Sequence, residues 1–166
     1  MNKILIEEMK AESWSSVQRI YNSGIATRNA TFETKAPEWD AWDQSHRNDC
    51  RLIATIDDRI AGWAALSNVS GRCVYAGVAE VSIYIDVAFR GTGVGDQLMK
   101  LLITESVGNG IWTLQAGIFP ENEASIALHV KHGFRILGTR EKIGKMDGRW
   151  RDTILLERRS KMVGID

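Results

Sequence analysis

The sequence has few of the residues that hold small secreted or metal-bound domains together. Its 166 residues include two cysteines, Cys50 and Cys73, and two prolines, Pro37 and Pro120. The cysteine spacing fits neither a CxxC pair nor a zinc finger, so we expect free, reduced thiols and no metal site. With no repeat and no Gly/Ser-rich linker, the chain is predicted to form a single domain over residues 1–166.

An excess of charge of one sign is also missing. The 21 Lys and Arg residues balance the 21 Asp and Glu residues, which argues against attraction to nucleic acid or to an anionic membrane. No apolar run reaches the roughly eighteen residues of a membrane helix. Glu7 and Glu8 interrupt the stretch where a signal peptide would be apolar. We therefore expect a cytoplasmic protein with no nucleic-acid or membrane partner.

The pattern of apolar residues alternates between the periods of strands and of helices. Ser13 is a candidate helix N-cap, and the turn Asp57-Asp58-Arg59 joins two strands of a predicted hairpin. The fold class is therefore α/β (α+β), a mixed sheet covered by helices. Strands are expected at residues 3–9, 51–56, 60–67, 79–86, 112–118, 134–143 and 151–157, and helices at 13–26, 37–47, 94–108 and 123–132.

The most informative segment is a glycine-rich loop at residues 90–95, Arg-Gly-Thr-Gly-Val-Gly, between a predicted strand and a predicted helix. Glycine lets the backbone turn tightly and approach a ligand closely. The first N–H groups of the helix favour a phosphate anion, and the Arg90 guanidinium adds a charged donor. The loop therefore predicts a phosphate site, and a strand-to-helix turn without a ligand is the alternative.

Two other phosphate motifs fail on their spacing. A Walker loop needs Lys directly after its last glycine, where this chain has Asp96. A Rossmann fingerprint needs its third glycine at that same position, and it usually follows the first strand of the chain. Neither a P-loop nor a dinucleotide site is predicted.

Three separated motifs instead resemble the GNAT superfamily of acyl-CoA-dependent N-acetyltransferases. Arg90, Gly93 and Gly95 satisfy the loop pattern of that superfamily. Residues 121–134 are similar to its Asn-containing helix and closing Gly-Phe. Residues 31–34 and 144–158 resemble, more narrowly, the phosphinothricin and methionine sulfoximine acetyltransferases. The resemblance implies a mixed, mostly antiparallel sheet of about six or seven strands.

The resemblance also implies which residues hold acetyl-CoA. The pyrophosphate would lie on the loop amides at the positive end of the helix, and the pantetheine arm would pair with strand backbone. Asn122 would contact that arm, although a plain helix N-cap is the alternative. The implied cofactor residues are Ile83, Tyr84, Ile85, Arg90, Gly91, Thr92, Gly93, Val94, Gly95, Asp96, Asn122 and Ser125.

Two residues are candidates for proton transfer. Glu80 matches the acidic residue of the central strand in related enzymes, and a base must take the proton of the attacking amine. An exposed strand carboxylate without function is the alternative. Where GNAT enzymes often have a Tyr that protonates the leaving thiolate, this chain has His129. A thiolate can also leave unaided near neutral pH.

The predicted acceptor site comprises Phe32, Glu33, Arg72 and Trp150, with Arg72 holding a carboxylate. The alternatives are a solvated arginine and ordinary aromatic packing. The resulting hypothesis is an acetyl-CoA-dependent N-acetyltransferase that acts by direct transfer on a small amino-acid-like acceptor, and relatives suggest a homodimer. A peptide or polyamine acetyltransferase and a non-catalytic acyl-CoA sensor remain as rivals.

Overall fold

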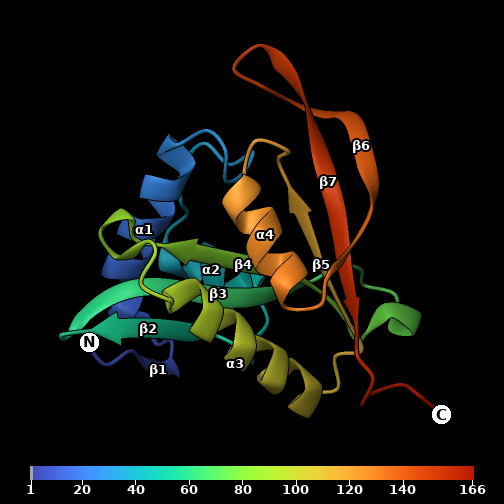
Figure 1. Ribbon diagram of the computed structural model, residues 1–166, viewed down its shortest axis with the longest axis horizontal. Coiled ribbons are helices and arrows are strands. Elements are labelled where there is room, and N and C mark those ends of the chain that lie inside the picture. Colours follow the sequence, from blue (N-terminus) through green and yellow to red (C-terminus); the bar gives the residue numbers. More distant parts are fainter. Residues whose placement is uncertain (1) are drawn as a thin grey trace.

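A computed structural model describes residues 2–166 (Figure 1). It has a seven-stranded open sheet in the order β1-β2-β3-β4-β5-β7-β6, in which all neighbours are antiparallel except β4 and β5. The predicted α/β class with a mostly antiparallel sheet of six or seven strands is confirmed. The strands are β1 (Leu5–Glu8), β2 (Leu52–Ile56), β3 (Arg59–Asn68), β4 (Val78–Ile85), β5 (Thr113–Ile118), β6 (Arg135–Met146) and β7 (Arg149–Arg159).

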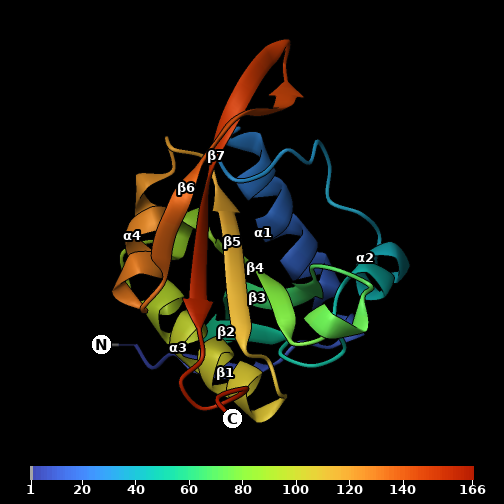
Figure 2. The same cartoon turned by 90° about the vertical axis from the view of Figure 1, so that its right-hand side faces the viewer.

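Four α-helices cover the two faces of this sheet, as Figure 2 shows. They are α1 (Trp14–Ala26), α2 (Trp39–Ser45), α3 (Val94–Gly108) and α4 (Glu123–Lys131). On one face α1 and α2 bury an aromatic cluster around Trp42 and Trp63, both fully enclosed. On the other face α3 buries Leu98, Met99 and Leu102 against the sheet. Helices cover both faces of the sheet, so its strands carry apolar residues on both sides. β3 shows this most clearly, with six consecutive buried residues.

The sheet opens in its middle, between the two parallel strands. β4 and β5 pair only from Val78 and Thr113 to Glu80 and Gln115, although β4 continues to Ile85 and β5 to Ile118. Beyond this point the two strands diverge (Figure 1). One edge of β4 therefore has backbone groups without a strand partner, and such groups are available to a ligand.

The hairpin of β6 and β7 is longer than predicted and extends away from the body of the fold (Figure 1). Its turn at Asp147 and Gly148 has positive φ at both residues, +50° and +77°, which matches the twist of the flanking strands. The register shifts between Arg140 and Gly144, where three residues of β6 face one residue of β7. This β-bulge interrupts the alternation on which the strand prediction depended.

Some smaller expectations were wrong. Ser13 is the N-cap residue of α1 as expected, but its side chain makes no capping hydrogen bond, because it ends a 3-10 turn (Ala11–Ser13) and its backbone is already helical. The helix expected at residues 37–47 is shorter, and Glu38 rather than Pro37 precedes it. Arg59 belongs to β3, since the hairpin turn needs only Asp57 and Asp58, both at positive φ.

Candidate functional site

A cavity of about 590 Å³ lies between the glycine loop, β4 and the start of α4. Every residue predicted to hold the cofactor lines it except Thr92, whose hydroxyl donates to the Phe89 carbonyl at 2.5 Å. The structure thus brings together Ile83, Tyr84, Ile85, Arg90, Gly91, Gly93, Val94, Gly95, Asp96, Asn122 and Ser125.

The glycine loop presents free backbone donors to this cavity. Gly91 and Gly93 have φ of +74° and +90°, a region that residues with side chains rarely adopt. Gly93 is the N-cap of α3, and its carbonyl accepts the first bond of the helix from Gln97. The N–H groups of Val94, Gly95 and Asp96 have no acceptor within the helix, so they can bind a phosphate.

Asp96 places a carboxylate beside this predicted phosphate site. Lys131, the last residue of α4, and His132, which follows it, approach it at 2.5 and 2.9 Å. These two partners hold the pKa of Asp96 below its usual range, so the carboxylate stays charged and paired. Two donors at the end of α4 therefore offset the repulsion that an isolated carboxylate would exert on a bound anion.

A second cavity of about 570 Å³ meets the first across the open part of the sheet. Glu80 lines it at the point where β4 and β5 separate, and Gln115 donates to its carboxylate at 3.0 Å. The two cavities share five lining residues: Ala30, Ile83, Tyr84, Asn122 and Ser125. A molecule that fills the first cavity can therefore present its reactive end to a molecule in the second.

Comparison with known proteins agrees with this geometry. Residues 13–134 match the family described as "Acetyltransferase (GNAT) family". The chain belongs to the GNAT family. YwnH of Bacillus subtilis is 38% identical to this GNAT chain over 148 residues, which are 86% of the chain and 91% of that protein.

Two further relatives carry names that indicate a reaction. The L-methionine sulfoximine/L-methionine sulfone acetyltransferase of Pseudomonas aeruginosa is 30% identical over 135 residues, covering 80% of this chain and 73% of that protein. The crystal structure of a phosphinothricin acetyltransferase from Sinorhizobium meliloti in complex with AcCoA is 26% identical. It has a TM-score of 0.87 and covers 98% of this chain and 91% of that one.

Two of the four acceptor residues predicted for this GNAT domain line the second cavity. Phe32 and Glu33 follow α1 and face the cavity mouth. The Phe32 ring packs edge-on against Phe119, with centroids 4.8 Å apart. It also lies against Gly144, where an added Cβ would be only 2.7 Å from the ring. The hairpin of β6 and β7 thus closes over the acceptor side of the GNAT domain.

The other two predicted acceptor residues lie outside the lining of both cavities. Arg72 is exposed in the loop before β4, with its guanidinium 5.6 Å from the Tyr75 ring. Trp150 is 60% exposed on β7 beside Lys145. The structure therefore does not bring Arg72 to the place where an acceptor carboxylate was expected.

His129 lines the second cavity but is poorly suited to give a proton. Its Nδ1 lies 2.7 Å from the Ser125 carbonyl, which assigns the ring proton to Nδ1 as donor. Its Nε2 is buried and has no hydrogen-bond partner within residues 2–166. Burial lowers the pKa of His129, so the neutral ring has a lone pair rather than a proton at Nε2. At neutral pH this nitrogen can accept a hydrogen bond but has no proton to give.

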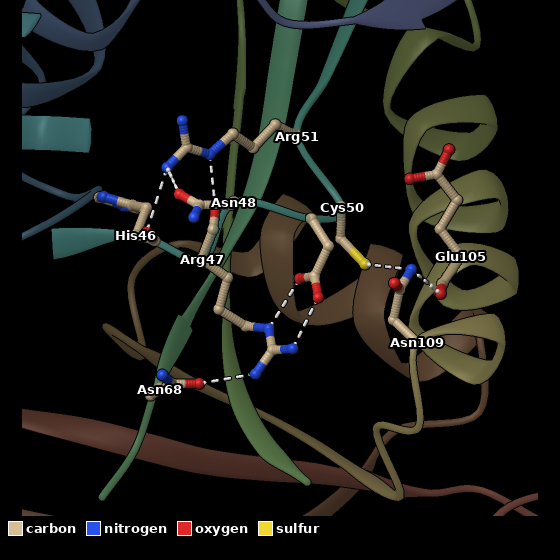
Figure 3. Close-up of polar contacts among 9 residues, drawn as sticks. His46, Arg47, Asn48, Cys50, Arg51, Asn68, Glu105 and Asn109 are labelled. Atoms are coloured by element: carbon tan, nitrogen blue, oxygen red, sulfur yellow. Dashed lines mark hydrogen bonds and ion pairs between the residues drawn. The ribbon is translucent and has the colours of Figure 1, made fainter. Parts of the chain in front are cut away.

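Ser45, the last residue of α2, and His46, which begins the α2–β2 loop, also line the second cavity and were not predicted from the sequence. His46 stacks on Trp42 at 4.2 Å, and burial lowers its pKa. Figure 3 shows how this loop is held: Arg51 donates to the carbonyls of Arg47 and His46. The loop has no hydrophobic periodicity, so its polar and ionisable side chains are the only feature of its sequence that could indicate a site.

The Arg51 guanidinium is the centre of this network. It forms an ion pair with Asp43 and lies 5.1 Å from the Trp42 ring centroid. Arg47 in turn holds Asp49 through a two-pronged ion pair at 2.6 and 2.7 Å and lowers its pKa. These contacts fix the loop that carries His46.

We predict that Arg51→Ala lowers the free energy of unfolding by about 2 kcal/mol or more, since one hydrogen bond to a charged group contributes about 1.5–3 kcal/mol. Urea unfolding measures the loss. Arg28→Ala is the control, because Arg28 forms an exposed ion pair with Asp147 at 3.4 Å, and such pairs contribute about 0–1 kcal/mol. Equal stability losses in both variants would contradict a structural role for Arg51.

Proposed function

We propose that this GNAT domain transfers an acetyl group from acetyl-CoA to the amino group of a small amino-acid-like acceptor. The observation that carries the proposal is the meeting of two cavities across the open part of the sheet. One cavity ends in a loop of free amides and the other contains a carboxylate. The names of the Pseudomonas and Sinorhizobium relatives support the acceptor class.

The first cavity has the features that acetyl-CoA requires. Its loop amides suit the pyrophosphate, and the unpaired edge of β4 beyond Glu80 suits the amides of a pantetheine arm. Asn122 and Ser125 face this edge from the start of α4, where the Asn122 side chain accepts from the Ser125 N–H at 3.3 Å. Acetyl-CoA supplies an activated thioester when it is bound.

Direct transfer then needs two contributions from the chain, a base and a hydrogen-bond donor. Glu80 takes the proton of the acceptor ammonium, directly or through one water, which leaves the nitrogen lone pair free to attack. A backbone N–H on the open edge of β4 donates to the carbonyl oxygen as negative charge develops there. The new C–N bond forms as the C–S bond breaks, the sulfur leaves as a thiolate, and the nitrogen gives its second proton to that thiolate or to water. His129 is not needed as a proton donor, because a thiolate is a stable leaving group near neutral pH.

Thiol release from acetyl-CoA, measured over a panel of amines, tests the proposal. We expect turnover with methionine sulfone, methionine sulfoximine or phosphinothricin and much slower turnover with spermidine and with an N-terminal peptide. Binding of acetyl-CoA with no thiol release from any amine would favour the sensor alternative. A faster reaction with the peptide or with spermidine would replace the acceptor class.

We also propose that residues 1–166 act as one domain, in the cytoplasm, as a homodimer. No helix within residues 2–166 is long and apolar enough to cross a membrane.

The support for a dimer is the outer hairpin, whose edge strand β6 exposes Ile136, Leu137 and Ile143. Light scattering should give twice the chain mass, and Ile136→Glu should lower it to one chain. A monomeric wild type would contradict the dimer alone.

A further inference from the structure

Few charged side chains line the second cavity, and more of them are negative than positive. Its lining includes the carboxylates of Glu33 and Glu80 and one guanidinium, that of Arg140 on β6. The two histidines in the lining, His46 and His129, both have pKa values lowered by burial, so they are neutral at pH 7. Arg140 therefore supplies the positive charge of this cavity.

Arg140 has no ion pair within the described part of the chain, and among the hairpin arginines without one it is the arginine that lines the second cavity. Arg135 binds Glu157 at 2.6 Å and Arg151 binds Glu121 at 3.1 Å, whereas Arg140 forms no such contact with residues 2–166. A guanidinium at a cavity wall without an anionic partner is free to bind an anionic group of a ligand, and its planar fork matches a carboxylate.

Arg140 faces the cavity together with Thr153, its ladder partner on β7, and a β-bulge follows it directly. β6 pairs with β7 at Arg140 and again at Gly144, so residues 141–143 stand opposite Asp152 alone. The Lys142 N–H donates to the Asp152 carboxylate at 2.8 Å, and Lys142 has a positive φ of +49°. The side chain of Asp152 thus replaces the missing ladder partner and holds the bulge in place.

The bulge changes which residues share a face. In a regular strand residues 140, 142 and 144 would face the same side, and residue 143 would face the other. Here Arg140, Ile143 and Gly144 all line the cavity and Lys142 does not. Bulges commonly re-aim side chains beside active sites in this way.

We propose that Arg140 binds the carboxylate of the acceptor, and that Asp152 positions Arg140 by holding the bulge that directly follows it in β6. The acceptor is then a zwitterionic free amino acid, with its ammonium toward the carboxylates of Glu33 and Glu80 and its carboxylate toward Arg140. This inference rests on the proposed function and adds the residue that selects a free acid over a peptide, an amide or a polyamine. It also moves the carboxylate anchor from Arg72 to β6.

The test compares methionine sulfone with its carboxamide as acceptors. In Arg140→Ala we expect kcat/KM for the free acid to fall about tenfold to a hundredfold, the range of one charge-assisted contact. The carboxamide should change by less than about threefold, since it makes no such contact. The affinity for acetyl-CoA, measured by calorimetry, should stay the same. Arg72→Ala is the matched control and should leave both acceptors unchanged.

Asp152 is tested as a positioning residue. Asp152→Ala should raise KM for the free acid with little change in kcat and no change in KM for the carboxamide. Asp152→Asn should restore the wild-type KM, because the amide oxygen can still accept from the Lys142 N–H. A general loss of structure would instead affect both acceptors and would not be rescued by asparagine.

Two results would overturn the inference while leaving the proposed function intact. One is a wild-type enzyme that acetylates acid and carboxamide equally well. The other is loss of the preference for the acid in Arg72→Ala but not in Arg140→Ala. Absence of thiol release with every amine would overturn the proposed function itself and this inference with it.

Discussion

Glu80→Gln is expected to lower kcat/KM about a hundredfold to ten-thousandfold near neutral pH, the usual contribution of a general base. The loss should shrink as the pH rises through the pKa of the acceptor amine, because a neutral amine needs no base before it attacks. Glutamine keeps the shape of the side chain and can still accept from Gln115, whose donor lies 3.0 Å away in the wild type. We therefore expect the fold and the acetyl-CoA affinity to be unchanged.

The pH–rate profile of thiol release measures this effect. Glu141→Gln is the control, since Glu141 lies on the bulge of β6 and does not line the cavity. Removing that carboxylate changes the charge near the site by the same amount without removing the base. If Glu80→Gln kept the wild-type rate and profile, the base would have to be another group, and Glu33 would be the next to test.

Gly93→Val is expected to lower the affinity for acetyl-CoA by about tenfold to a hundredfold. Gly93 has φ of +90°, and holding a β-branched residue in such a conformation costs about 1–3 kcal/mol. The loop avoids this cost by changing shape, which moves the free N–H groups of Val94 and Gly95 away from the pyrophosphate. The Cβ itself meets no atom within 4 Å, so the effect comes from backbone conformation and not from crowding.

Isothermal titration calorimetry with acetyl-CoA measures the loss in Gly93→Val. Gly108→Ala, at the other end of the same helix, is the control, since its backbone needs no positive φ and an added Cβ meets no neighbour. It should bind acetyl-CoA as the wild type does. A folded Gly93→Val protein with wild-type affinity would show that the loop does not hold the pyrophosphate.

The sequence predicted local features of the fold well where one residue type sets the boundary. α3 runs from Val94 to Gly108 as expected, because Gly93 can begin it at positive φ and the chain turns at Asn109 and Gly110. The hairpin of β6 and β7 was predicted too short at its turn, by three residues of β6 and two of β7. The dipeptide Asp147-Gly148 is a strong hairpin signal that would have extended it.

The candidate site divides in the same way. The cofactor side comes from short motifs that resemble those of the GNAT family, so the sequence could locate almost all of its lining. The acceptor side is assembled from α1, the α2–β2 loop, β4 and β6, and one chain gives no signal of which distant residues meet there. From the sequence alone, Arg72 and Arg140 are equally plausible as the residue that binds the acceptor carboxylate. The structure distinguishes them, because Arg140 pairs with Thr153 on the cavity side of the hairpin, whereas Arg72 lies in a loop outside the lining of both cavities.

The incomplete pairing of β4 and β5 also has a consequence for stability. Only three residue pairs join the two halves of the sheet, so in the absence of a ligand the protein can open locally between β4 and β5. A ligand bound between β4 and β5 connects the two halves in place of a strand. At a hundred times its dissociation constant, it raises the free energy of unfolding by about 2.7 kcal/mol. The supply of acetyl-CoA would then set how tightly the two halves hold together, as well as how fast the enzyme works.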